Sequence, residues 1–148
     1  MTPQGRWFDE VAVGEAFDSA MTVTDAHLVL GAGYVGDFNP LHVNEEFAKR
    51  SRFGGRILHG MLTGALMGGP VGMHFHGTAM AYLEHNVRFL AAVRPGDTLT
   101  IAWKVTGLVP KPRHSAGIVE LAGTATNQHG EVAAEATSKI MVYLRPAA

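Results

Sequence analysis

The last third of the chain alternates apolar and polar residues with a period of two, which is typical of strands that bury one face. Turn residues separate the segments, with Pro95–Asp97 and Gln128–Gly130 supplying the backbone angles that tight reversals need. A fourth strand is expected over about Ala79–Leu90, and we expect these strands to form an antiparallel meander with one solvated and one buried face. The three alternating segments are residues 97–106, 119–126 and 131–144.

The buried face of such a sheet needs an apolar cover, and His59–Gly69, which carries no Asp, Glu, Lys or Arg, is the candidate. Its glycines at 60, 64 and 68 recur every four residues and so line one helix face, where a sheet can approach closely. Two shorter helices are expected, one with Thr24 as its N-cap that continues to Tyr34, and one over Glu45–Arg52. The pattern predicts an α+β fold in which an antiparallel sheet curls around a central helix.

Length and charge limit the possible classes of protein. The 148 residues correspond to one domain, expected to span 1–148, since domains average roughly 150 residues. Twelve Lys and Arg balance thirteen Asp and Glu, for a formal charge of −1, so no strong field attracts nucleic acid or an acidic membrane. The absence of cysteine excludes disulfides, thiolate metal sites and a cysteine nucleophile. A small, locally recognised partner is expected.

Two stretches bear on location in the cell. Met1–Glu10 contains Arg6, Asp9 and Glu10 where a signal peptide would need an apolar run, which favours a cytoplasmic protein. Ile57–Leu83 lacks charged residues, but six glycines and a proline interrupt it. It therefore predicts a helix buried within the fold and no membrane span.

Three familiar motifs are weak here. Gly31–Gly36 matches the G-x-G-x-x-G spacing of dinucleotide sites, but Pro40 follows too soon for the required helix, so a helix end is the simpler interpretation. His74 and His76 have the alternate spacing of some metal sites, yet no third ligand follows, and we expect no metal there. No serine lies in a G-x-S-x-G elbow.

Gly36–His42 concentrates reactive side chains within seven positions. On a helix, Asp37 and His42 would point about 140° apart, but Pro40 is expected to prevent that helix and to lock a loop. Such a loop can turn the carboxylate and the imidazole toward one water molecule, which the pair could hold and deprotonate. Ordinary turn chemistry is the alternative for these residues.

The start of the central helix supplies a second chemical element. The first amides of a helix have no intrahelical acceptor, so the amide of Gly60 could bind an oxyanion if it faces a cavity. His59, immediately before it, is expected to satisfy nearby carbonyl groups and not to act as a base.

These stretches resemble one known family. Tyr34–Ala48 resembles the hydratase-2 motif of the MaoC-like family, which includes (R)-specific enoyl-CoA hydratases with the hotdog fold. His59–Leu62 resembles the start of that family's central helix, and Val87–Leu90 with Val93–Leu99 resembles its first long strand and turn. The similarity covers most of the chain and implies a single hotdog domain.

The resemblance implies an acyl-CoA hydratase or dehydratase. Asp37 and His42 would be the catalytic acid/base pair, and the Gly60 amide would bind the thioester carbonyl. The reaction would be reversible syn hydration of a 2-enoyl-CoA to the 3-hydroxyacyl-CoA inside an apolar tunnel. It would need no metal and no cofactor, since coenzyme A enters only as part of the substrate. Edge-to-edge pairing of two sheets would give a homodimer or a higher homo-oligomer.

Other residues are expected to assist. Gly36, Asn39, His59 and Thr63 would support the site, while Gly68 stands where some (R)-hydratases place a supporting serine. A basic cluster could bind coenzyme A phosphates, although surface charge on a short helix is the alternative, and Met61 is expected to contact substrate. The cluster comprises Lys49, Arg50, Arg52 and Arg56.

Two other functions stay open. A hotdog thioesterase would use a carboxylate and the same helix end to hydrolyse the thioester, but hydrolysis does not require the paired histidine. A non-catalytic module would bind the acyl thioester and leave it unchanged.

Overall fold

Five strands and one long helix account for most of the fold in the computed structural model, which describes residues 5–147. Residues 1–4, part of the N-terminal stretch considered above, and residue 148 lie outside the described residues. The strands form one antiparallel sheet in the order β1-β3-β4-β5-β2. Their bounds are β1 (Ala16–Thr22), β2 (Ala79–Phe89), β3 (Thr98–Lys111), β4 (Ala116–Thr126) and β5 (Val132–Tyr143).

The neighbours of β2 and β3 differ from the predicted meander. Strands β3, β4 and β5 do pair in succession, but β2 pairs with β5 at an edge of the sheet and is separated from β3 by β4 and β5. Residues 90–97, between β2 and β3, form no tight hairpin, and the place beside β3 is taken by β1. The alternating pattern predicts which segments are strands but does not determine which strands become neighbours.

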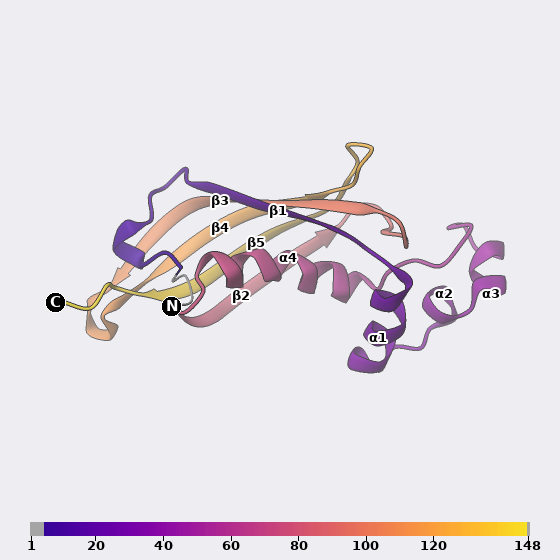
Figure 1. The fold of residues 1–148 in the computed structure, drawn as a ribbon, viewed down its shortest axis with the longest axis horizontal. Helices are drawn as coiled ribbons and strands as arrows, with labels where there is room; N and C mark the ends of the chain where they lie inside the picture. The colour runs from indigo at the N-terminus through magenta and orange to yellow at the C-terminus, as the bar shows by residue number, and fades with distance from the viewer. Residues whose placement is uncertain (1–4, 148) are drawn as a thin grey trace.

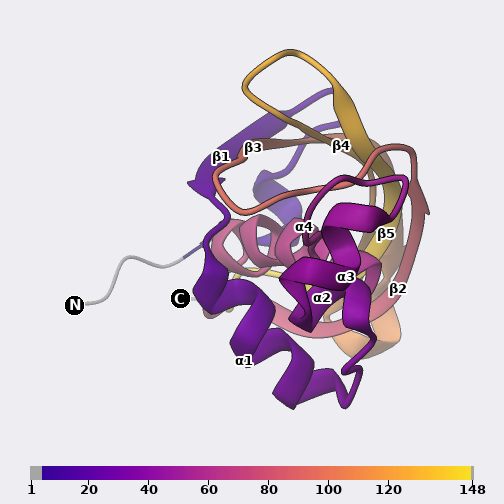
Figure 2. The same ribbon diagram turned by 90° about the vertical axis from the view of Figure 1, so that its right-hand side faces the viewer.

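The predicted central helix is α4 (Gly60–His74), and the sheet wraps around it (Figure 2). It continues through Pro70 beyond the predicted end at Gly69. Its glycine stripe faces edge strand β2, as expected for close approach. A Cβ added to Gly60 would lie 3.3 Å from the Phe89 ring, and one added to Gly64 would lie 3.2 Å from Val87 Cγ2. A Cβ added to Gly68 would lie 4.0 Å from the Tyr82 hydroxyl.

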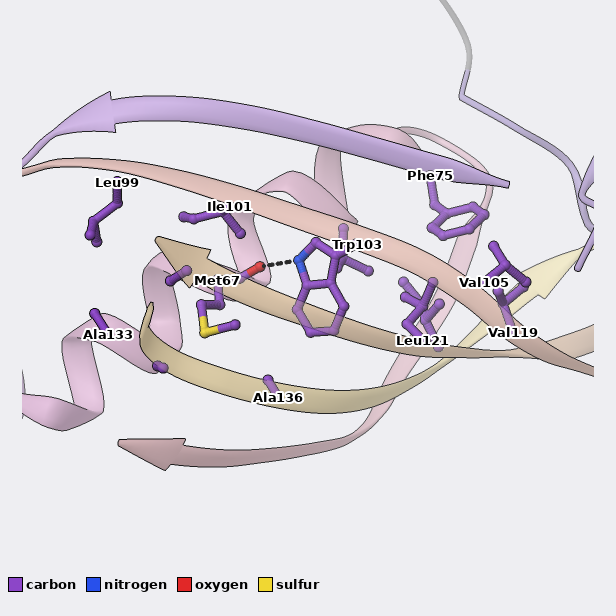
Figure 3. Packing of buried hydrophobic residues seen from close by; sticks show 14 of the residues in the cluster. Met67, Phe75, Leu99, Ile101, Trp103, Val105, Val119, Leu121, Ala133 and Ala136 are labelled. Carbon is purple, nitrogen blue, oxygen red and sulfur yellow. Dashed lines mark hydrogen bonds between the residues drawn. The ribbon is translucent and has the colours of Figure 1, made fainter. Parts of the chain in front are cut away.

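The inner face of the sheet forms the core against α4. In β3 the predicted apolar set is buried and the intervening residues are exposed, which confirms the period of two. The Trp103 indole lies at the centre, where its Nε1–H donates to the Met67 carbonyl of α4 at 2.9 Å (Figure 3). This bond satisfies the buried indole N–H and ties the sheet to the helix. The apolar set is Leu99, Ile101, Trp103 and Val105. These features are those of the predicted α+β hotdog fold.

Three short helices gather at one end of the molecule, beside the start of α4 (Figure 1). They are α1 (Asp25–Val35), α2 (Pro40–Val43) and α3 (Glu45–Arg50). Thr24 is the N-cap of α1, as predicted, and α3 ends before the predicted Arg52. Short 3-10 turns occur at η1 (Phe8–Glu10) and η2 (Pro112–His114). No helix within residues 5–147 combines the length and hydropathy needed to cross a bilayer.

The loop around Pro40 differs from the prediction in one respect. Gly31 and Gly33 lie in α1, and Gly36 ends that helix with a φ of 70°, so the glycine motif is a helix end. Pro40 does not prevent a helix but begins one, since a proline at the first helical position loses no hydrogen bond. Asp37 lies outside α2 and His42 within it.

Candidate active site

The loop between α1 and α2 positions the carboxylate of Asp37. Gly36 reverses the chain in the left-handed region, and the Asn39 N–H donates to Asp37 Oδ1 at 3.0 Å. The Asn39 side chain caps α2 by accepting from the Leu41 N–H at 3.0 Å, which orients the loop. These contacts leave Asp37 Oδ2 free to face His42.

His42 presents one free nitrogen to Asp37. Its Nδ1 lies 2.7 Å from the Ile57 carbonyl, so Nδ1 carries a proton and, in the neutral ring, Nε2 keeps a lone pair. Nε2 is 3.7 Å from Asp37 Oδ2, beyond a direct hydrogen bond. The structure therefore brings the two predicted side chains together, with two acceptor atoms facing one gap.

The two side chains differ in burial, in contrast to the expected apolar tunnel. The His42 side chain is 11% exposed, but that of Asp37 is 51% exposed. None of the elements in residues 5–147 covers the outer side of the Asp37 loop. In a single chain the site is thus open to solvent on the carboxylate side.

His59 contacts both members of the pair. Its Nε2–H donates to the main-chain oxygen of Asp37 at 2.9 Å, which is the carbonyl contact expected from the sequence. Its ring stacks on His42, with centroids 3.8 Å apart and planes inclined by 26°. Nδ1 is buried and has no hydrogen-bond partner among the described residues. The stacking was not predicted, because no local pattern signals contact between residues so far apart.

The first turn of α4 provides amide donors beside this pair. The Gly60 and Met61 amides have no acceptor within the helix, and His59 is the N-cap residue. Thr63 is buried, and its hydroxyl donates weakly to the His59 carbonyl at 3.4 Å, so it supports the helix start. Met61 is exposed. A pocket at this end is lined by Arg52, Phe53, Ile57, Leu58, Gly60, Thr63, Phe89, Leu90, Ala91, Ala92 and Val93.

The same cluster is also a possible ligand set for a metal ion. Asp37, His42 and His59 place potential ligand atoms within 4.8 Å of one another. Each ring donates one N–H to a carbonyl, as metal-ligating histidines also do. However, the two rings are stacked with their planes inclined by only 26°, so their remaining lone pairs lie in nearly parallel planes. Converging lone pairs are needed for metal coordination, so this geometry suits a bound water better than an ion.

The basic cluster does not act as one unit. Arg56 is held by two carboxylates, with Nε 2.8 Å from Glu45 and a terminal nitrogen 2.6 Å from Asp25. The hydrogen bond to Glu45 raises the pKa of Arg56. This pairing joins α1 to α3 and differs from the phosphate-binding role expected for Arg56.

The other basic side chains lie on the surface. Arg50 and Arg52 are exposed, and Lys49 pairs with Glu46 at 3.3 Å. Arg52 lies over the Phe53 ring at 4.8 Å and lines the pocket beside Gly60. Of the four predicted cations, Arg52 is the one that lines this pocket.

The two histidines considered for a metal lie elsewhere. His74 ends α4, stacks on Phe17 at 3.9 Å and faces Glu15 at 3.2 Å, while His76 lies in the following turn. Burial lowers the pKa of His74, and the nearby Glu15 partly offsets this effect. His74 therefore packs at the far end of the helix from Gly60.

Comparisons with known proteins point to one family. The model of the MaoC like domain matches residues 10–128. An (R)-specific enoyl-CoA hydratase of Rhodospirillum rubrum is 34% identical over 139 residues, covering 94% of this chain and 93% of that protein. A 3-hydroxybutyryl-CoA dehydratase of Methylorubrum extorquens is 32% identical over 117 residues, which cover 78% of this chain and 74% of that protein. The structure of the unliganded R-hydratase PhaJ1 of Pseudomonas aeruginosa superposes with a TM-score of 0.83 at 29% sequence identity. The superposition covers 94% of this chain and 86% of that chain.

Proposed function

The chain belongs to the MaoC-like domain family, and on that basis we propose that it catalyses reversible hydration of a 2-enoyl-CoA to the 3-hydroxyacyl-CoA. This is the reaction of a hydro-lyase. The names of two relatives, a hydratase and a dehydratase, support the two directions of the reaction. The observation that carries the proposal is the pair of free acceptor atoms, Asp37 Oδ2 and His42 Nε2, 3.7 Å apart beside the start of α4.

A water molecule between Asp37 and His42 would donate one hydrogen to each acceptor. Its oxygen lone pairs would then be free to attack Cβ of the enoyl group. As the O–Cβ bond forms, one water proton passes to the pair, which acts as general base. The electron pair of the double bond moves toward the thioester oxygen.

The amide of Gly60 would stabilise that oxygen. Charge develops there as the enolate forms, and the amides of the first helical turn lie at the positive end of the α4 dipole. The proton then moves from the pair to Cα and the carbonyl re-forms. Because water and proton come from the same two side chains, both add to one face, so we propose syn addition. This scheme requires no metal and no cofactor.

Arg52 is the side chain we propose for coenzyme A recognition. It is exposed and lines the pocket that also contains Gly60 and Thr63, so a thioester seated at Gly60 could extend its phosphates toward it. Arg50 is exposed nearby in the chain and could add to the attraction. Arg56 is not included because its guanidinium binds Glu45 and Asp25.

We also propose that the protein acts as a homodimer. Strand β2 is an edge of the sheet and exposes Leu83 and Phe89, an arrangement that favours pairing with another edge. The half-exposed Asp37 is consistent with a second copy covering the open side of the site. Sedimentation or light scattering would measure the assembly. The cytoplasmic location stays a prediction.

An assay with a conjugated enoyl-CoA separates the proposal from its rivals. A hydratase removes the absorbance of the conjugated double bond and releases no free thiol. A thioesterase releases free coenzyme A thiol, and a non-catalytic binding module changes neither signal. Thiol release, or no change in either signal at high protein concentration, would contradict the proposed function.

A further inference from the structure

His59 connects the parts of the site that the hydration mechanism uses. We infer that His59 is a positioning residue for this reaction, holding the Asp37 backbone and the plane of the His42 ring in one arrangement. This inference rests on the proposed function. In this role His59 transfers no proton. It acts only through Asp37 and His42, the two side chains that would hold the water.

The first contact fixes the position of Asp37. The carboxylate is half-exposed, and its hydrogen bond within the described chain comes from the Asn39 N–H of its own loop. The bond from His59 Nε2–H to the Asp37 main-chain oxygen, at 2.9 Å, instead anchors the loop to the start of α4. Without it, the loop would be free to shift relative to the helix.

The second contact fixes His42. The hydrogen bond from its Nδ1–H to Ile57 sets the direction of the ring within its own plane but allows it to tilt. The stacked His59 ring, 3.8 Å away, restricts that tilt. Together the two contacts direct Nε2 toward Asp37.

The chemistry of the His59 ring supports a positioning role. His59 is 2% exposed, and its Nδ1 has no partner, although an unpaired buried polar atom costs stability. A phenylalanine would avoid that cost but could not donate to Asp37, and a glutamine could donate but could not stack. The histidine provides both the flat ring and the donor in one side chain.

His59 also links the pair to the oxyanion donor. It is the N-cap residue of α4, and the amide proposed to bind the thioester oxygen belongs to the next residue, Gly60. A displacement of His59 would therefore change the distance between the bound water and the oxyanion site. Small misplacements of reacting groups reduce turnover strongly.

Two substitutions separate the contacts. His59→Phe keeps a ring and loses the donor, and we expect kcat to fall about 10- to 100-fold with KM within about threefold. His59→Gln keeps a donor and should recover part of that loss. The control is His85→Phe, which removes a similar bond, from Nε2–H to the Gly64 carbonyl of α4 at 2.9 Å, away from the pair. A kcat for His59→Phe close to wild type, or a fall no larger than that of His85→Phe at equal melting temperature, would overturn the inference.

A second measurement does not depend on activity. Imidazole 15N NMR distinguishes the two tautomers, and the structure predicts that His42 carries its proton on Nδ1. His59→Gln, which removes the stacked ring, should shift or broaden the His42 signals, and His85→Phe should leave them unchanged. Unchanged His42 signals in His59→Gln would overturn the inference even in an active enzyme. Shifted signals in a protein that hydrates no enoyl thioester would reject the proposed function and would still show that the His59 ring holds the His42 ring.

Discussion

Asp37 Oδ2 and His42 Nε2 face each other across 3.7 Å without a direct hydrogen bond. Each side chain is fixed by its other polar atom, Asp37 by the Asn39 amide and His42 by the Ile57 carbonyl. Two acceptors directed at one gap create a place for a molecule with two hydrogens to donate. This relationship is the basis of the proposed chemistry.

Removing either member of the pair should abolish most turnover while preserving the fold. We expect Asp37→Asn and His42→Ala each to lower kcat at least about a hundredfold, because each removes one acceptor for the water. Asp37 is half-exposed, so the melting temperature of the Asp37→Asn protein should stay close to that of wild type. Asp18→Asn, an exposed carboxylate in β1, is the matched control. Wild-type activity in both site variants would remove the assignment.

Arg52 and Arg56 should respond differently to truncation. Arg52→Ala should raise KM for a coenzyme A thioester several-fold with kcat nearly unchanged, and should have little effect on a short thioester that lacks the phosphates. Arg56→Ala should mainly lower the melting temperature, since it breaks the links to Asp25 and Glu45. These exposed ion pairs limit the loss to about 1 kcal/mol. A larger KM effect from Arg56→Ala than from Arg52→Ala would contradict this division.

Two glycine substitutions test the packing of the core. A Cβ at Gly123 would lie 2.5 Å from the Trp103 ring and 2.8 Å from the Ala102 carbonyl oxygen. Gly123→Ala should therefore reduce the free energy of unfolding by about 1–3 kcal/mol. Gly72 lies in α4 with open space around it, so Gly72→Ala should raise the free energy of unfolding by up to about 1 kcal/mol. Denaturant titration measures both, and a stabilising Gly123→Ala would reject the described packing.

His74 should make stability depend on pH. Burial lowers its pKa below the ordinary value of about 6.5, so the unfolded chain takes up the proton first as the pH falls. Folding stability should thus decline as the pH falls from about 6.5 through the lowered pKa of His74.

The test replaces His74 and follows thermal unfolding between about pH 7.5 and 5. His74→Gln should have lower stability at neutral pH, because it loses the stack on Phe17, but a flatter decline toward acid. His114→Gln, which removes an exposed histidine from η2, is the control. Equal slopes for His74→Gln and wild type would show that His74 does not cause the acid-side loss.

The sequence predicted the elements whose pattern follows from burial on one face. Strand β3 alternates because its apolar side chains cover α4, and the glycine stripe of α4 predicts close approach to a strand. Strand β1 was missed because Ala16–Thr22 mixes small and polar residues. None of its residues is buried, so the strand shows no apolar–polar alternation. The order of the strands depends on contacts between distant segments, which no local pattern records.

The site was predictable only in part for the same reason. The short spacing of Asp37 and His42 around Pro40 indicated that a loop could bring them together, although Pro40 begins a helix instead of preventing one. The contacts of His59 with Asp37 and His42 span the loop and α3, and no spacing rule indicates them. Arg56 resembled its basic neighbours in sequence, and only the fold places it between two carboxylates.

The stereochemistry of hydration in deuterium oxide tests the central claim most directly. If Asp37 and His42 hold one water and return its proton, deuterium at C2 and the hydroxyl at C3 will lie on the same face of the former double bond. NMR of the 3-hydroxyacyl product formed by wild-type protein measures this relation, with Asp37→Asn as the low-activity control. Syn product from wild type and its loss in the variant are the predicted results. Anti or mixed addition, or the same rate in both proteins, would contradict the account.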